Sequence, residues 1–379
     1  MNSKGAELMG LAGMKEPWVE KDSAGKPTGR INDPGLAQMA AKIPRPAKET
    51  FETNALALIG DLNKAGITTA GISGCADEAT RFFRARADKG EATFRFMCMV
   101  GIPPTPNLQS VEQAVAPALA KIKLYQGDNW IDDVMIGESL NLSDNMVQAH
   151  TNYTADQLAV WRGAAMEVAK NGLPLHQHAT ISETFPAFLD QIEAVNKVYP
   201  IRNLRWSFAH MDQVSANDLA RMKKLGMYAG VRAIPSVMGG EFSRAHGEKS
   251  VDMPPLKMIQ DSGILWGIHT DTTEVNQYKP FQTLYFLTTG KMVGGKVVNR
   301  QPVTREEALI AHTRNNAFLV FRENDLGSIS AGKLADLVVM DRDYLTVPVD
   351  QIKDIKVVQT MVGGRIAYDA ASPAARGTK

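Results

Sequence analysis

The sequence predicts an α/β fold of the (β/α)8 barrel type, in which parallel strands form the centre and helices lie outside. Strand-like segments alternate with helix-like segments from residue 68 to residue 270, and the helical segments carry start and stop signals. Seven strands over this length fit a barrel that lacks one strand better than a doubly wound sheet. The predicted strands span residues 68–73, 93–100, 131–138, 173–179, 205–211, 227–233 and 264–270.

The helix signals lie between these strands. A first helix is expected where apolar residues recur at helical spacing between residues 51 and 62, and Gly66 ends it. Capping-box spacing, in which two side chains satisfy free amides of the first turn, occurs at Ser110 with Gln113 and at Thr154 with Gln157. Gly172 and Gly226 stand where helix C-caps are expected.

The pattern changes after residue 302. Residues 303–321 read as one helix opened by Thr304 and Glu307 in capping-box spacing. Residues 327–341 and 354–369 read as short strands joined by glycine-containing turns. We therefore predict a barrel over residues 1–318, a small β-sandwich-like unit over 319–370 and a disordered tail over 371–379.

Composition excludes several classes of function. Hydrophobic residues make up 44% and charged residues 22%, with a net charge of +1, and no basic stripe suggests nucleic acid. No apolar segment is long enough to span a membrane. The N-terminus lacks the layout of a signal peptide, which predicts a cytoplasmic protein, unless a longer precursor carries one upstream. Cys75 and Cys98 are the only cysteines, and we expect two buried thiols.

Histidines gather at the ends of predicted strands, where barrel enzymes build their active sites. His176 and His178 end one strand, His210 ends the next, and His269 with Asp271 ends the last. Residues two apart on a strand share a face, so these side chains are expected to converge on one pocket. A single histidine in an apolar strand is usually a packed core residue, but the joint placement favours a zinc-type metal site.

Other polar residues carry weaker signals. Glu138 and Arg232 also end strands, and we expect both to bind substrate, the arginine through a carboxylate. His150, His246 and His312 are interpreted as a solvated residue, a surface-loop residue and a packed helix residue. The Gly/Pro-rich segment 235–255 is expected to form a mobile cover over the site.

Several segments resemble a known family. "GSISAGKLADLVVMDRD" resembles the C-terminal signature of the amidohydrolase superfamily. "HATISE", "FAHMDQVSANDLARMKKLGM", "GIHTDTTEV" and "REEALIAHTRNNA" together resemble amidohydrolase family 3, the group of N-substituted formamide deformylases and of proteins like the exoenzyme regulatory protein AepA. The resemblance runs from residue 2 to residue 369.

The resemblance implies roles for individual residues. It makes His178 and His210 metal ligands on the fifth and sixth barrel strands, and Asp271 the eighth-strand aspartate that binds metal and moves the proton. The implied cofactor is a divalent metal, most simply zinc. The family's first strand, with its His-x-His pair, has no counterpart in this chain, and Met135 stands where relatives carry a bridging ligand. Hypothetically, His176 and His269 partly replace the lost ligands and hold a single metal.

Two functions stay open at this point. The first is a metal-dependent hydrolase that uses metal-activated water on a C–N bond, an amide in a small-molecule substrate, with Asp271 as general base and then acid. The second is a non-catalytic or truncated relative with a binding or regulatory role, because a barrel without its first strand has open strand edges. A homo-oligomer is neither predicted nor excluded.

Overall fold

A computed structural model describes residues 1–31, 35–40, 42–43, 46–146, 150–272 and 276–372. The chain divides into two compact units, residues 1–57 and 58–379. The first unit contains helices α1 (Ser3–Leu8) and α2 (Gly35–Ala40) and an antiparallel pair of strands, β1 (Val19–Lys21) and β2 (Pro27–Ile31). Its small core is formed by Leu11, Trp18, Val19 and Met39.

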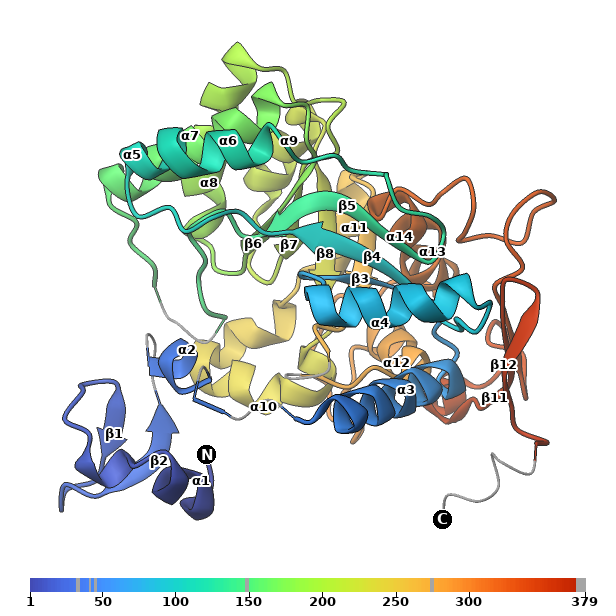
Figure 1. The fold of residues 1–379 in the computed structure, drawn as a ribbon. Helices are drawn as coiled ribbons and strands as arrows, with labels where there is room; N and C mark the ends of the chain where they lie inside the picture. Colours follow the sequence, from blue (N-terminus) through green and yellow to red (C-terminus); the bar gives the residue numbers. More distant parts are fainter. Residues whose placement is uncertain (32–34, 41, 44–45, 147–149, 273–275, 373–379) are drawn as a thin grey trace. The chain divides into compact units, whose positions relative to one another are not determined.

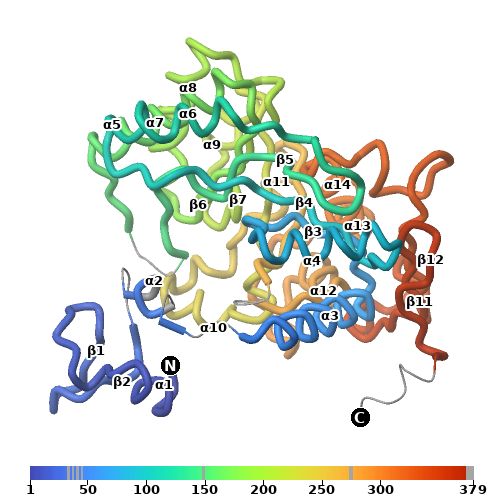
Figure 2. The backbone as a smooth tube through the Cα atoms, viewed as in Figure 1, coloured from blue at the N-terminus to red at the C-terminus, as the bar shows by residue number. Residues whose placement is uncertain are grey.

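The second unit is built on a parallel seven-stranded sheet with strand order β3-β4-β5-β6-β7-β8-β9. The strands curl into a half-barrel with helices on the outside (Figures 1 and 2), so the predicted barrel-type α/β class is confirmed. Each predicted strand is present, shifted by at most two residues at either end. The strands are β3 (Thr69–Ile72), β4 (Arg95–Val100), β5 (Ile131–Glu138), β6 (Leu175–Ala179), β7 (Ser207–His210), β8 (Tyr228–Arg232) and β9 (Trp266–His269).

Helices follow the strands and cover their outer face. Helix α7 packs against α8, and α8 packs against α9, so the three form one layer over β5–β8 (Figure 1). Large apolar side chains of this layer, such as Trp161 and Phe188, are fully buried. The helices of the unit are α3 (Lys48–Lys64, which begins in the first unit), α4 (Asp77–Asp88), α5 (Leu108–Ser110), α6 (Ala116–Leu119), α7 (Ala155–Lys170), α8 (Thr184–Val198), α9 (Ala216–Leu225), α10 (Pro235–His246), α11 (Leu256–Ser262), α12 (Pro280–Thr289), α13 (Arg305–His312) and α14 (Arg314–Leu319).

Most of the predicted helix signals are confirmed. Thr154 and Thr304 each cap a helix in a capping box, and Gly226 forms a left-handed C-cap with φ 76°. The box predicted at Ser110 is wrong, because the cap lies one turn earlier at Asn107, whose side chain accepts from the Ser110 amide. Asparagine is as good an N-cap as serine, and sequence spacing alone did not separate the two.

Two predictions on loops and helices are corrected. Segment 235–255 is largely helical, because Pro235 occupies the first turn of α10 and a 3-10 turn, Gly247–Asp252, follows. His246 therefore ends a helix and does not lie in a loop. The helix predicted over residues 303–321 is broken at Thr313, whose φ of −119° and ψ of −83° separate α13 from α14.

Two asparagine side chains of α14 cover the outer edge of β9. Asn315 Nδ2 donates to the Trp266 carbonyl and Asn316 Nδ2 to the Ile268 carbonyl, each at 2.8 Å. On the β8 side, the amides of Ala229 and Ala233 donate to the carbonyls of residues 265 and 269, which alternate with those of Trp266 and Ile268. The two asparagines therefore satisfy acceptors that would otherwise form an open edge. Amide side chains thus replace strand pairing here.

The C-terminal segment forms the expected small β-unit. Strands β10 (Leu337–Met340), β11 (Val357–Val362) and β12 (Arg365–Asp369) make an antiparallel three-stranded sheet. The domain boundaries at residues 318 and 370 stay predictions, and most of the predicted tail lies outside the described residues. No helix among the described residues is long and apolar enough to cross a membrane.

The expectation of two buried thiols is wrong. Cys75 and Cys98 form a disulfide with a Cα–Cα distance of 5.6 Å. Strands β3 and β4 are parallel neighbours, with Ile72 opposite Cys98, and Cys75 follows β3 by three residues. The sequence could not show this, because the pairing depends on the register between the strands.

Candidate metal centre

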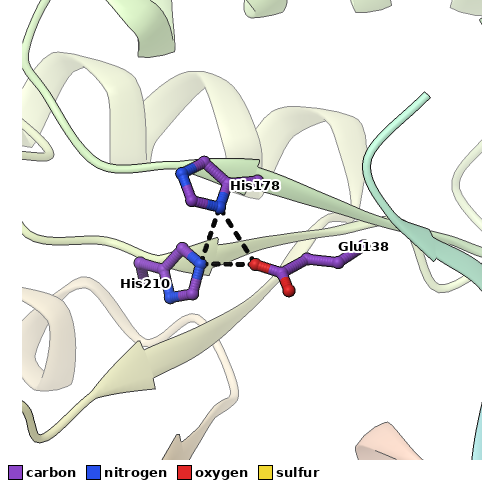
Figure 3. A group of neighbouring side chains, drawn as sticks. All are labelled: Glu138, His178 and His210. Atoms are coloured by element: carbon purple, nitrogen blue, oxygen red, sulfur yellow. Dashed lines mark hydrogen bonds and ion pairs between the residues drawn. The ribbon is translucent and has the colours of Figure 1, made fainter. Parts of the chain in front are cut away.

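Three side chains meet at the carboxyl ends of three adjacent strands. Glu138 ends β5, His178 lies near the end of β6 and His210 ends β7 (Figure 3). Glu138 Oε1 lies 3.0 Å from His178 Nδ1 and 2.5 Å from His210 Nε2, and the two ring nitrogens lie 2.9 Å apart. Among the described residues, this trio forms a group with the geometry to hold a metal ion. We call it the Glu138–His178–His210 cluster.

The donor set suits a metal of the zinc type, for which imidazole nitrogens and a carboxylate oxygen are usual ligands. Burial opposes a charge on Glu138, but its hydrogen bonds with both histidines hold the pKa of its carboxyl far below the ordinary value. Burial and the nearby positive charge of Arg232 lower the pKa of His210, which keeps this imidazole neutral, as a ligand must be. The cluster therefore presents an anionic oxygen beside a neutral ring nitrogen.

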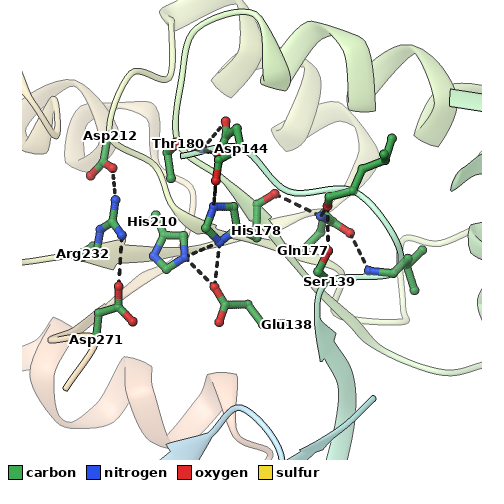
Figure 4. A network of polar contacts seen from close by, with 12 residues as sticks. Glu138, Ser139, Asp144, Gln177, His178, Thr180, His210, Asp212, Arg232 and Asp271 are labelled. Carbon is green, nitrogen blue, oxygen red and sulfur yellow. Dashed lines mark hydrogen bonds and ion pairs between the residues drawn. The ribbon is translucent and has the colours of Figure 1, made fainter. Parts of the chain in front are cut away.

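His178 is held from behind by Asp144. Burial disfavours a charged His178, but its hydrogen bonds with Asp144 and Glu138 raise its pKa to about 9. His178 Nε2 lies 2.8 Å from the Asp144 carbonyl and 3.1 Å from its Oδ1, and Nδ1 faces Glu138 (Figure 4). The Asp144 carboxylate is itself fixed by hydrogen bonds from the Thr180 and Ile181 amides and from the Thr180 and Thr184 hydroxyls.

Gln177 sets which face of β6 the histidines occupy. Its side chain points to the face opposite the histidines, where Oε1 accepts from Trp161 Nε1 at 3.0 Å and Nε2 donates to the Leu142 carbonyl at 2.9 Å. Because side chains alternate along a strand, this buried anchor leaves His176 and His178 together on the other face. The sequence pattern indicated the two histidines but not the role of Gln177 between them.

The other two predicted histidine ligands lie outside the Glu138–His178–His210 cluster. His176 Nδ1 is 2.7 Å from Ser207 Oγ, and burial lowers the pKa of His176 to about 4. The His269 ring lies 5.0 Å from the His210 ring, centroid to centroid, and its Nε2 is buried without a hydrogen-bond partner.

Arg232 and Asp271, two further predicted site residues, contact each other. Arg232 Nη1 donates to Asp271 Oδ2 at 3.0 Å, and Nη2 donates to Asp212 Oδ2 (Figure 4). Arg232 lies close enough to His210 for its positive charge to lower the pKa of that histidine, so Asp271, which Arg232 binds, lies near the cluster but outside the trio itself. The sequence did not indicate Asp144 and Asp212, because both follow their strands in loops without periodicity.

The remaining histidines lie elsewhere. His150 has an exposed side chain paired with Glu183, as expected for a solvated residue. His246 Nε2 lies 2.6 Å from the Met146 carbonyl. His312 is part of helix α13, in agreement with its interpretation as a helix residue.

Comparison with known proteins places the chain among hydrolases. An N-substituted formamide deformylase from Arthrobacter pascens is 22% identical over 389 residues, which cover 97% of this chain and 71% of that enzyme. Uncharacterized metal-dependent hydrolases from Pyrococcus furiosus and Pyrococcus horikoshii OT3 share the fold, with TM-scores of 0.64 and 0.67. Their sequence identities are 18% and 17%, over 91% and 92% of this chain and 70% of each of theirs.

The sequence model of the amidohydrolase family matches residues 2–368. Together with the hydrolase neighbours, this match supports a metal-dependent hydrolase acting on a small molecule. Because the match spans nearly the whole chain, the protein belongs to the amidohydrolase family.

Proposed function

We propose that this protein hydrolyses a C–N bond, that of an amide in a small molecule, with the help of a divalent metal. The observation that carries the proposal is the convergence of Glu138, His178 and His210 at the ends of adjacent strands. The deformylase relative from Arthrobacter pascens supports the choice of an amide as substrate.

Glu138, His178 and His210 would hold the ion, and zinc fits this donor set best. Glu138, expected from its place at a strand end to bind substrate, is thereby proposed as a metal ligand. When bound, the ion would supply Lewis-acid activation of water and of the amide carbonyl. Asp144 keeps the protonated Nε2 of His178 turned away, so that Nδ1 is offered to the cluster.

Asp271 is the proposed proton carrier, and a further ligand to the same ion. Its side chain is 32% exposed at the end of β9, so a substrate can reach it. Asp271 takes a proton from the attacking water as the water oxygen bonds to the amide carbon. It then returns the proton to the amine nitrogen as the C–N bond breaks.

His176 and His269 remain proposed auxiliary ligands. The support for His269 is its buried Nε2, which has no hydrogen-bond partner and lies in a ring next to that of His210. Metal binding that survives replacement of both histidines by alanine would contradict this part of the proposal.

The first experiment is the metal content of the purified, untagged protein, measured by inductively coupled plasma mass spectrometry. We expect about one zinc, iron or manganese per chain. His178→Ala and His210→Ala should lose the metal, while His150→Ala, a change at an exposed histidine, should keep it. Folded wild-type protein without metal would refute the proposal and favour a non-catalytic relative. Metal-loaded protein is then tested on N-substituted formamides and other small amides.

A further inference from the structure

Two short sequences repeat at the ends of β7 and β9. Each strand ends in a histidine, and an aspartate follows two residues later: His210 with Asp212, and His269 with Asp271. Strand β8 lies between these strands in the sheet and ends at Arg232. The arginine is therefore placed midway between the two aspartates.

Arg232 binds both aspartates at once. Its terminal nitrogens donate one to Asp271 and the other to Asp212, and its Nε has no partner. Arg232 and Asp212 are 3% and 2% exposed, whereas the Asp271 side chain is 32% exposed. The buried end of this chain of contacts is Asp212, and the end that faces the site is Asp271.

This geometry differs from that of an arginine whose terminal nitrogens are free to bind a substrate. Both terminal nitrogens are engaged by carboxylates of the same chain, and Nε is buried. A guanidinium presents its donors in a fixed planar fork, so two carboxylates bound to it have a fixed position relative to each other. Asp212 is buried, and among the described residues its Oδ1 has no hydrogen-bond partner while its Oδ2 accepts from Arg232. Arg232 therefore links a buried, enclosed carboxylate to the partly exposed carboxylate of Asp271.

We infer that Arg232 is a positioning residue that, anchored by Asp212, holds the Asp271 carboxylate beside the Glu138–His178–His210 cluster. This inference rests on the proposed function, because Asp271 is the proposed proton carrier and ligand. The advantage is preorganisation: an aspartate held in one orientation does not have to find its place in each turnover. Arg232 also supplies the positive charge without which Asp212 would be a bare buried anion.

The test uses the full chain loaded with cobalt(II), whose visible absorption spectrum reports the ligands of the ion. The variants are Arg232→Gln, Arg232→Lys, Asp212→Asn and Asp271→Asn. The matched control is Arg95→Lys. Arg95 is the first residue of β4, and its guanidinium binds the carboxylate of Asp336; the two side chains are 1% and 5% exposed. Cobalt stoichiometry, the spectrum and the thermal midpoint are measured for each protein, with kcat and KM for any amide found to be a substrate.

Arg232→Gln and Asp212→Asn should keep one cobalt per chain, and their spectra should change in the same way as that of Asp271→Asn. Their kcat should fall by about 100-fold with KM nearly unchanged, the scale of loss from a misplaced catalytic group. Arg232→Lys should recover only part of kcat, because an ammonium cannot bind both carboxylates as a planar fork does. Arg95→Lys should lower the thermal midpoint and leave the spectrum and kcat as in the wild type.

A wild-type spectrum in Arg232→Gln and Asp212→Asn, alongside a changed spectrum in Asp271→Asn, would overturn the inference. A rise in KM without a fall in kcat would also overturn it, because Arg232 would then be contacting substrate. If Arg232→Gln does not fold, the spectrum and kcat of Asp212→Asn decide the question, because this change removes the negative charge that binds Arg232 at nearly constant side-chain volume. A wild-type protein that binds no cobalt refutes the proposed function itself, and this is known before any variant is compared.

Discussion

The carboxylate of Asp144 lies 3.1 Å from Nε2 of His178, on the far side of the ring from Nδ1, the nitrogen that faces Glu138. The two ring nitrogens of His178 therefore have separate tasks. Asp144 fixes the orientation of the ring, and Nδ1 is turned toward the cluster, where its proton would leave when a metal ion binds.

Replacing Asp144 by asparagine should weaken zinc binding by about 10- to 100-fold, because the orienting carboxylate of a ligand histidine is lost. The affinity is measured by competition with a chromophoric chelator. Asp218→Asn is the matched control, since Asp218 is a buried aspartate whose carboxylate accepts from the amide of Ser215, the N-cap of helix α9. Equal zinc affinities in the two variants would show that Asp144 does not act through His178.

The metal-free protein should be most stable near pH 6.5. The pKa of His178 is raised to about 9 from 6.5, so the stability gained from its protonation is complete below 6.5 and is lost as pH rises toward 9. Burial lowers the pKa of His176 to about 4, so stability is also lost as pH falls below 6.5 and the unfolded chain takes up a proton there.

Urea unfolding in the presence of a chelator, at pH values on either side of 6.5, measures this profile. In His178→Ala, the free energy of unfolding should no longer fall between pH 6.5 and 9, and its dependence on pH below 6.5 should be unchanged. His176→Ala should reduce the slope on the acidic side. A free energy of unfolding that rises steadily from pH 6.5 to 9 in the wild type would contradict the assignment.

Gln177→Leu should lower the free energy of unfolding by about 2–3 kcal/mol, because buried partners are left without hydrogen bonds. Those partners are Trp161 Nε1, the Leu140 amide and the carbonyls of Leu142 and His178. The matched experiment is a double-mutant cycle with Trp161→Phe, which removes the unsatisfied donor. Trp161→Phe should lower the free energy of unfolding less in the Gln177→Leu variant than in the wild type. Additive losses would mean that the Trp161–Gln177 hydrogen bond contributes little.

Asn316→Ala should cost about 1–3 kcal/mol of stability, since the Ile268 carbonyl on the edge of β9 loses its donor. Denaturant unfolding measures the loss. Asn171→Ala is a control, because Asn171 donates to a carbonyl at the exposed end of helix α7, where water can replace it. Similar losses for the two variants would show that the edge of β9 does not depend on the asparagine.

The sequence predicted the sheet well because strand periodicity and helix caps are local signals. It placed His178 and His210 at the ends of adjacent strands, and the structure brings them together. It did not reveal that Glu138 joins them, since the contact depends on how β5 pairs with β6. Asp144 could not be predicted either, because only the folded loop brings it behind His178.

The contact between Arg232 and Asp271 could not be predicted from the sequence either. Arg232 ends β8 and Asp271 follows the last residue of β9 by two, but no pattern in the sequence indicated that the two contact each other. Their contact with one another, and with Asp212, follows from the order of β7, β8 and β9 in the sheet. A sequence pattern predicts that a residue lies at the end of a strand, but it does not predict which residue of the neighbouring strand it contacts.

The disulfide between Cys75 and Cys98 closes a ring that contains helix α4 and the exposed turn that follows it. A protease that cuts at Lys89 would therefore leave two fragments joined by one covalent bond. The nicked chain would run as a single band on a gel without reductant and as two bands with it. Limited proteolysis thus offers a way to see this bond without removing either cysteine.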